Sequence, residues 1–141
     1  MTATPGWEHF DVEADVGVRA WGPTRAAAFE QAALGMFALV VAPGDVVEAE
    51  TREVRAQGDS PENLLVNWLN ECLYVHEIEG FAVRRVEVIR LVETTVHGLL
   101  CGEVLDRARH RLGTVVKAVT LHQARVTEPG VRHEVSVIVD V

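Results

Sequence analysis

Two segments of the chain place apolar residues at the three- and four-residue spacing of an amphipathic helix. The first opens at Thr24, a good N-cap, and is predicted to run to about Val41. The second opens at Ser60, where Pro61 suits the first helical turn, and is predicted to end at Gly80. The apolar positions are Phe29, Ala32, Ala33, Met36, Phe37 and Val40 in the first segment, and Leu64, Leu65, Trp68, Leu69, Cys72, Leu73 and His76 in the second.

Elsewhere the apolar residues alternate with polar ones, which is the pattern of half-buried strands. The predicted strands span residues 7–11, 16–21, 46–56, 81–92, 95–104, 114–126 and 131–141. The fourth and fifth are expected to form a hairpin through Glu93 and Thr94. In the third, the pattern sets Val47, Ala49 and Thr51 on the face opposite Glu48, Glu50 and Arg52.

This order of elements predicts the α+β class: a single domain over residues 1–141, with two main helices packed on a mostly antiparallel β-sheet. Residues 1–6 are expected to be a frayed N-terminus. No apolar run is long enough to span a membrane, and residues 1–6 do not resemble a signal peptide, so we expect a cytoplasmic protein. Cys72 and Cys101 lie in apolar stretches and are expected to be buried thiols.

The net charge of -8 argues against direct binding of nucleic acid, because affinity for the phosphate backbone comes mainly from Lys and Arg. Any link to RNA is therefore expected to run through a protein partner. An acidic surface suits a basic partner or cations.

The common catalytic motifs are missing: there is no G-x-S-x-G, GxxxxGK[ST], H-E-x-x-H or CxxC sequence. We therefore expect a protein that is not an enzyme. The six histidines are scattered. Among them, His76 is expected in the core or at its edge, His110 is expected to be solvated in the basic loop 106–113, and His122 is a candidate site residue after a strand.

Three acids, Asp11, Glu13 and Asp15, crowd into five residues near the N-terminus. Either they occupy a solvated loop or a bound cation holds them together. A hard cation takes carboxylates, backbone carbonyls and water as ligands. At the other end of the chain, the side chain of Asp140 and the carbonyl and terminal carboxylate of Val141 can converge on one point. The alternating valines that lead to Asp140 favour a chain end tied into a sheet over a frayed tail.

Six pieces of the sequence, in the right order, resemble the archease family. They are residues 7–22, 32–37, 64–71 with Leu73 and Tyr74, Glu79 with Gly80, 116–122 and 139–141. The resemblance departs from the family at Val12 and Glu13, where archeases usually carry His and Thr in a His-Thr-Ala-Asp run; Asp15 is retained. A contact that this His normally makes is therefore in question here.

The resemblance implies an accessory protein that activates an RtcB-type tRNA-splicing RNA ligase by promoting its guanylylation and multiple turnover. It also implies a divalent cation, Ca²⁺ in the first place and Mg²⁺ or Mn²⁺ otherwise, with Asp15, Asp140 and Val141 as ligands. Lys117 is implied as a second functional position, and His122 and Asp11 are weaker candidates for contact with the partner. Two other functions stay open: a general chaperone or interaction module, and a small metal-dependent hydrolase. Exposed valine-rich strand edges also allow a homo-oligomer.

Overall fold

The computed structural model describes residues 4–128, 130 and 132–141. Its helices are α1 (Arg25–Val40), the short 3-10 helix η1 (Pro43–Asp45) and α2 (Pro61–Glu79). Its strands are β1 (Gly6–Val12), β2 (Asp15–Gly22), β3 (Glu50–Gln57), β4 (Phe81–Leu91), β5 (Thr95–Val104), β6 (Ala118–Thr127) and β7 (His133–Asp140).

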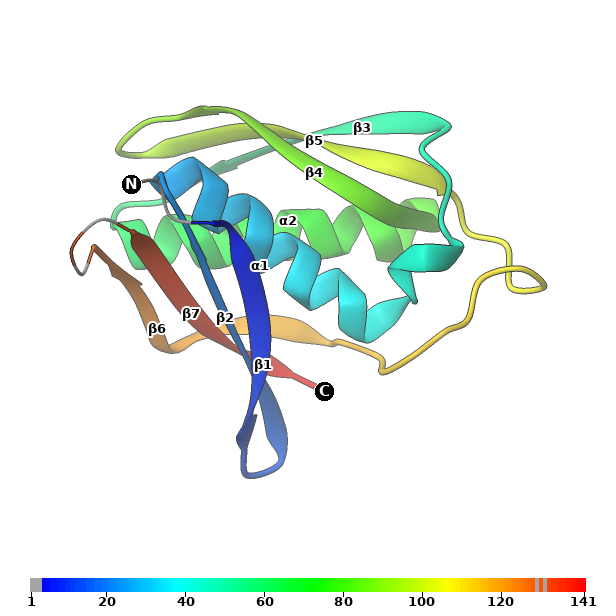
Figure 1. Cartoon of the computed structure of the whole chain (residues 1–141), viewed down its shortest axis with the longest axis horizontal. Helices are drawn as coiled ribbons and strands as arrows, with labels where there is room; N and C mark the ends of the chain where they lie inside the picture. Colours follow the sequence, from blue (N-terminus) through cyan, green and yellow to red (C-terminus); the bar gives the residue numbers. More distant parts are fainter. Residues whose placement is uncertain (1–3, 129, 131) are drawn as a thin grey trace.

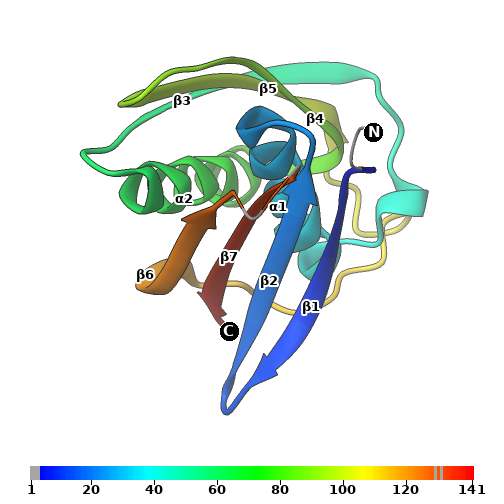
Figure 2. The same ribbon diagram turned by 60° about the vertical axis from the view of Figure 1, so that its left-hand side comes forward.

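The strands form two antiparallel sheets, one of four strands in the order β1-β2-β7-β6 and one of three in the order β3-β5-β4. Helices α1 and α2 lie between the two sheets as a middle layer (Figures 1 and 2). The predicted α+β class and the antiparallel pairing are confirmed. The strands are divided between both sides of the helix pair, so that each helix is covered on two sides.

Local signals set the ends of both helices as the sequence predicts. The side-chain oxygens of Thr24 and Ser60 each accept a backbone N–H from the first turn, at 3.0 Å in both cases. Gly80 ends α2 in the left-handed conformation, with φ of 60°, which costs a residue without a Cβ little.

The core fills both interfaces of the helix layer. Trp68 of α2 is fully buried, and its indole N–H donates to the carbonyl of Phe29 in α1 at 3.2 Å, which joins the two helices. From the four-stranded sheet, Val135, Val137 and Val139 of β7 point inward and are at most 1% exposed. The outer face of this sheet therefore carries the other half of each strand's side chains.

The β1–β2 hairpin is fixed to α1 through its inner face. His9 is hydrogen-bonded to the carbonyl of Gly35, with 2.8 Å between Nε2 and the oxygen. A Cβ on Gly35 would lie 2.7 Å from Val18 and 3.3 Å from Trp7, so glycine is what allows the strands to approach the helix this closely. The hairpin turn lies beyond the helices, at the same end as the C-terminus (Figures 1 and 2).

Some strand boundaries, and the extent of one alternating pattern, differ from the prediction. β3 begins at Glu50 rather than at 46, and its buried residues are Val54 and Ala56, whereas Val47 is 58% exposed. The predicted alternation holds within the strand, where Thr51 lies on the face opposite Glu50 and Arg52, but it does not extend to residues 47–49, which follow the turn after η1. β6 begins at Ala118 rather than at 114, and β1 already begins at Gly6, inside the expected frayed segment. Residues 1–3 and 131 lie outside the described residues.

The predicted hairpin between β4 and β5 is confirmed, and both cysteines are buried and free. None of the described helices has the length and apolar character needed to cross a membrane.

Candidate metal site at the end of the four-stranded sheet

The register of the four-stranded sheet brings the two predicted carboxylates together. β2 and β7 pair with Val16 opposite Val139, and the next position in this register sets Asp15 opposite Asp140. On either side, Val12 lies opposite Asp15 and Ala118 lies opposite Asp140. We call these four residues, Val12, Asp15, Asp140 and Ala118, the end row. One residue from each strand of the sheet thus meets at the end near the hairpin turn.

The end row faces away from the helices. Val139 is fully buried against the helix layer, and side chains alternate along a strand, so Asp140 points to the outer face. Asp15 shares that face because directly opposed residues of antiparallel strands lie on the same side of a sheet. Both carboxylates are half-buried. The pair is therefore open to solvent or to a partner.

The turn between β1 and β2 has only two residues, Glu13 and Ala14. Glu13 has a φ of 39°, a region that non-glycine residues rarely adopt. This tight turn fixes the position of Asp15, the first residue of β2, relative to Val12.

The donor set fits a hard cation. Like charges at directly opposed positions destabilise a strand pair, and neither Asp15 nor Asp140 forms an ion pair with another described residue. A divalent cation would relieve this repulsion, with carbonyls and water completing its shell. Among the described residues, no group of three or more His, Cys, Asp or Glu side chains gathers to hold a metal. The pair therefore depends on backbone or chain-end oxygens for further ligands.

The last residues of the chain are held in place. The backbone N–H of Lys117 donates to the carbonyl of Asp140 at 2.7 Å, and Val141 is partly buried against the core. The predicted tie of the chain end into a sheet is confirmed, since β7 runs to Asp140. Lys117 is exposed and lies next to the end row through this backbone contact.

Two other candidates lie elsewhere. Asp11 is opposite Val16, one position from the end row, so its side chain points to the other face of the sheet from Asp15. His122 is exposed and lies in an irregular part of β6 between Thr120 and Arg125, farther along the strand. Val12 stands in the end row beside Asp15, and its alkyl side chain cannot coordinate a cation.

His110 is a correction to the sequence analysis, which expected it to be solvated. It is 2% exposed. Its Nδ1 accepts the backbone N–H of Asp106 at 2.9 Å, so its Nε2 is the nitrogen that donates to Glu103, at 3.0 Å. The Arg109 guanidinium, the Val47 backbone N–H and His110 together lower the pKa of Glu103 to about 2. Because both ring nitrogens are hydrogen-bonded, His110 anchors the 106–113 loop to Glu103 of β5.

The comparisons with known proteins agree with this architecture. The Archease protein family matches the chain over residues 7–141. The archeases of Thermococcus gammatolerans and Pyrococcus abyssi are 40% and 38% identical to it over 125 residues, which cover 85% of this chain and 87% of each relative.

Two solved structures share the fold. The solution structure of Methanobacterium thermoautotrophicum protein 1598 has a TM-score of 0.80 and 30% identity, covering 96% of this chain and 99% of that one. The crystal structure of a Thermotoga maritima protein, described as an archease and possible chaperone, has a TM-score of 0.61 at 18% identity, covering 95% and 96%. The resemblance seen in the sequence is thus confirmed over nearly the whole chain, which belongs to the archease family.

Proposed function

We propose that the protein activates an RtcB-type tRNA-splicing RNA ligase by promoting its guanylylation, and so allows multiple turnover. It would act as an accessory protein, with a divalent cation held by Asp15, Asp140 and Val141. Ca²⁺ is the first candidate for that cation, and Mg²⁺ and Mn²⁺ are the others. Membership of the archease family supports the proposal.

The observation that carries the proposal is the carboxylate pair of the end row. Asp15 and Asp140 come from opposite ends of the chain and meet at opposed positions of β2 and β7. A bound cation would supply positive charge and open coordination positions at this end of the sheet. The chain's own contribution is to hold the two carboxylates on the outer face, through the tight turn at Glu13 and the hydrogen bond between Lys117 and Asp140.

The position and the charge of the site suit contact with a larger protein. The hairpin turn and the C-terminus lie at one end of the molecule, beyond the helices (Figure 2). The net charge of -8 favours association with a basic, RNA-binding protein through long-range attraction. Exposed Lys117 adjoins the end row, which supports its assignment to the contact with the ligase.

The test is a guanylylation assay of the ligase in metal-buffered solution, with and without this protein. We expect Asp15→Ala and Asp140→Ala each to reduce the stimulation at least tenfold. Asp59→Ala is the matched control, because it removes an exposed carboxylate from the loop between β3 and α2 and should keep the stimulation. Full stimulation by both end-row variants would overturn the site assignment. No stimulation by the wild-type protein would overturn the function.

A second candidate function is a general chaperone, the role suggested for the Thermotoga maritima relative. The observation in its favour is a set of exposed apolar side chains on α2, in the segment that precedes β6 and on β6 itself: Tyr74, Ile78, Leu112, Val115 and Leu121. Suppression of aggregation of unrelated proteins, unchanged by a chelator, would favour this function. Turnover of a nucleotide or phosphate ester by the protein alone would instead indicate a metal-dependent hydrolase.

A further inference from the structure

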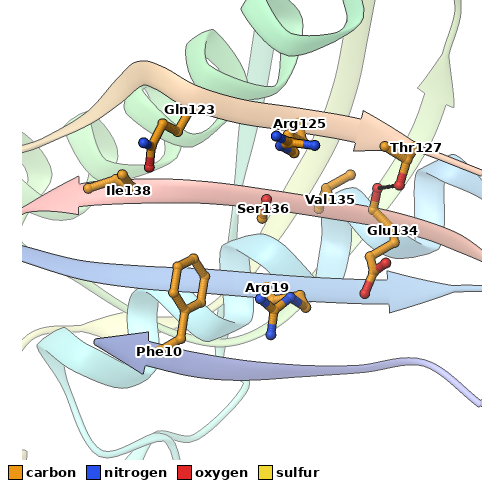
Figure 3. Close-up of a pocket in the computed structure, with 9 residues that line it drawn as sticks. All are labelled: Phe10, Arg19, Gln123, Arg125, Thr127, Glu134, Val135, Ser136 and Ile138. Carbon is orange, nitrogen blue, oxygen red and sulfur yellow. Dashed lines mark hydrogen bonds between the residues drawn. The ribbon is translucent and has the colours of Figure 1, made fainter. Parts of the chain in front are cut away.

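The outer face of the four-stranded sheet holds a second row of polar residues, four positions along β2 from the end row. Arg19 lies between Glu8 of β1 and Ser136 of β7, and Ser136 lies opposite Arg125 of β6. We call Glu8, Arg19, Ser136 and Arg125 the arginine row. Figure 3 shows the two arginines on either side of Ser136. Helices cover only the other face of this sheet, so the row is open (Figure 2).

The two arginines are held differently. The guanidinium of Arg19 pairs with Glu8 at 2.8 Å and lies 4.8 Å from the centre of the Phe10 ring, so its position is fixed. Arg125 is exposed on the edge strand and forms no ion pair with another described residue. Arg19 is therefore fixed with its charge balanced by Glu8, and Arg125 keeps its charge available for a ligand.

Arg19, Ser136 and Arg125 of the row line a groove of about 500 Å³. Its centre is low because Ser136 is small, while the long side chains of Arg19 and Arg125 stand on the neighbouring strands (Figure 3). Strands in a sheet are about 4.8 Å apart, so the backbones of the two arginine positions are about 10 Å apart. A phosphate-sized group fits between them over the serine hydroxyl.

A bulge in β6 brings a further donor to the groove. Thr120 pairs with Ile138 and Arg125 with Ser136, so β6 has three more residues than β7 in this interval. Gln123, within the bulge, has a φ of 59°, and its side-chain amide lies over Ile138 at one end of the groove (Figure 3). Bulges at sheet edges commonly redirect a side chain towards a site. The irregular backbone thus serves to place an amide beside the arginine row.

The local charge is also favourable. Glu134 lines the groove, but its carboxylate pairs with Arg132 at 3.0 Å, and Glu8 is occupied by Arg19. Three arginines (Arg19, Arg125 and Arg132) and two glutamates (Glu8 and Glu134) give one net positive charge in and around the groove, on a protein whose net charge is -8.

We propose that this groove binds the phosphate group of a ligand, with Arg19 and Arg125 at its sides and Ser136 and Gln123 as hydrogen-bond donors. Arg125 and Gln123 offer donors from β6, Ser136 offers one from the floor, and Arg19 adds a cation on the β2 side; this set suits a tetrahedral oxyanion better than a planar carboxylate. Arg19 is four residues from Asp15 along β2, or about 13 Å, so the phosphate site is distinct from the carboxylate pair. The proposal does not depend on the function proposed above.

The test is a titration of the isotope-labelled protein with phosphate and pyrophosphate at constant ionic strength, followed by NMR. We expect saturable shifts at Ser136, Gln123 and Arg125, and at least tenfold weaker binding for Arg125→Gln. Ser136→Val should also weaken binding, since it fills the floor of the groove with a residue that suits a strand. Both variants should keep the wild-type spectrum elsewhere, which shows that the fold is intact.

Arg90→Gln is the matched control, because it removes an equally exposed arginine from the other sheet and should leave binding unchanged. Malonate tests the oxyanion geometry and should bind more weakly than phosphate. The proposal is wrong if the shifts do not saturate, if Arg90→Gln weakens binding as much as Arg125→Gln, or if malonate binds as well as phosphate.

Discussion

Asp15, the first residue of β2, and Asp140, the last residue of β7, stand opposite each other on neighbouring antiparallel strands. Their carboxylates share the outer face of the sheet and have no ion-pair partner among the described residues. Two like charges in this arrangement are unfavourable for the fold unless a cation binds. Without metal, removal of one carboxylate should therefore stabilise the protein. With metal, the same removal should take away the stabilisation that metal binding provides.

In the presence of a chelator, we expect Asp140→Asn to raise the free energy of unfolding by about 0.5 kcal/mol, because the repulsion with Asp15 is removed. With Ca²⁺ at 100 times its dissociation constant, the wild-type protein should gain about 2.7 kcal/mol and the variant much less. Urea denaturation in both conditions measures the two effects. Asp11→Asn, on the other face, should respond to Ca²⁺ like the wild type. An equal gain for Asp140→Asn and the wild type would contradict the site.

The pair formed by Glu103 of β5 and His110 of the 106–113 loop predicts a specific loss of stability in acid. The pKa of Glu103 falls from its usual value of 4.5 to about 2, chiefly through Arg109 and then through the backbone N–H of Val47. A carboxyl with a lowered folded-state pKa stabilises the fold above its unfolded pKa. This contribution is lost as the pH falls from about 4.5 to about 2.

We therefore expect Glu103→Gln to be less stable than the wild type at pH 7, with the difference shrinking as the pH approaches 2. Urea midpoints at pH 7, 4 and 2.5 measure this change. Glu93→Gln, at an exposed position in the β4–β5 turn, is the control and should follow the wild type at every pH. A difference between Glu103→Gln and the wild type that does not vary with pH would show that the carboxylate charge is not the cause.

The sequence predicts those parts of the fold that local signals decide. Thr24, Ser60 and Gly80 mark the helix ends because capping depends on neighbouring residues. The separation into two sheets was not predictable in this way, since β7 pairs not only with its neighbour in sequence, β6, but also with β2, near the other end of the chain. The burial of His110 was not predicted for a related reason. The charged residues around it, in segment 106–113, are typical of a solvated loop, and the burial of His110 depends on its contact with Glu103 of β5.

The two candidate sites differ in how far the sequence reveals them. Asp15 and Asp140 were predicted as a pair because acidic crowding, a valine strand that ends at Asp140 and the family resemblance point to the same place. The arginine row was not predicted. Arg19, Arg125 and Ser136 come from three strands, and the bulge in β6 shifts their register by three residues, which a single sequence does not show.

Gly102 of β5 should be intolerant of a side chain. A Cβ at this position would collide with the carbonyl oxygen of Ala82 on β4, which is held in the ladder and cannot move aside. We expect Gly102→Ala to lower the free energy of unfolding by about 3 kcal/mol, as for an overpacked core. Gly44→Ala is the control, because a Cβ there meets nothing within 4 Å and should change stability by less than about 1 kcal/mol. Urea denaturation of both variants checks the contrast, and equal stability of the two would contradict the collision.

The two thiols should differ in reactivity although both are buried. Cys72 is fully buried in α2, and burial raises its pKa well above the usual value. Cys101 is 2% exposed and lies opposite Arg85 in the β4–β5 pair. Opposed residues share a face of the sheet, so the Arg85 side chain lies beside the Cys101 thiol. Arg85 forms an ion pair with Glu48 at 2.8 Å, and both side chains are about half exposed. The Arg85 side chain can therefore move away from Cys101 without unfolding of the protein.

We therefore expect iodoacetamide to modify Cys101 before Cys72, with Cys72 reacting only at the rate of global unfolding. Glu48→Gln should accelerate the modification of Cys101 several-fold, because it weakens the contact that holds Arg85 in place, and should leave the rate at Cys72 unchanged. Glu8→Gln, in an ion pair of the other sheet, is the control and should change neither rate. Mass spectrometry of peptides after timed alkylation measures both sites. Modification of the two cysteines at one common rate would show that the ion pair does not control access to Cys101, since only global unfolding would then expose either thiol.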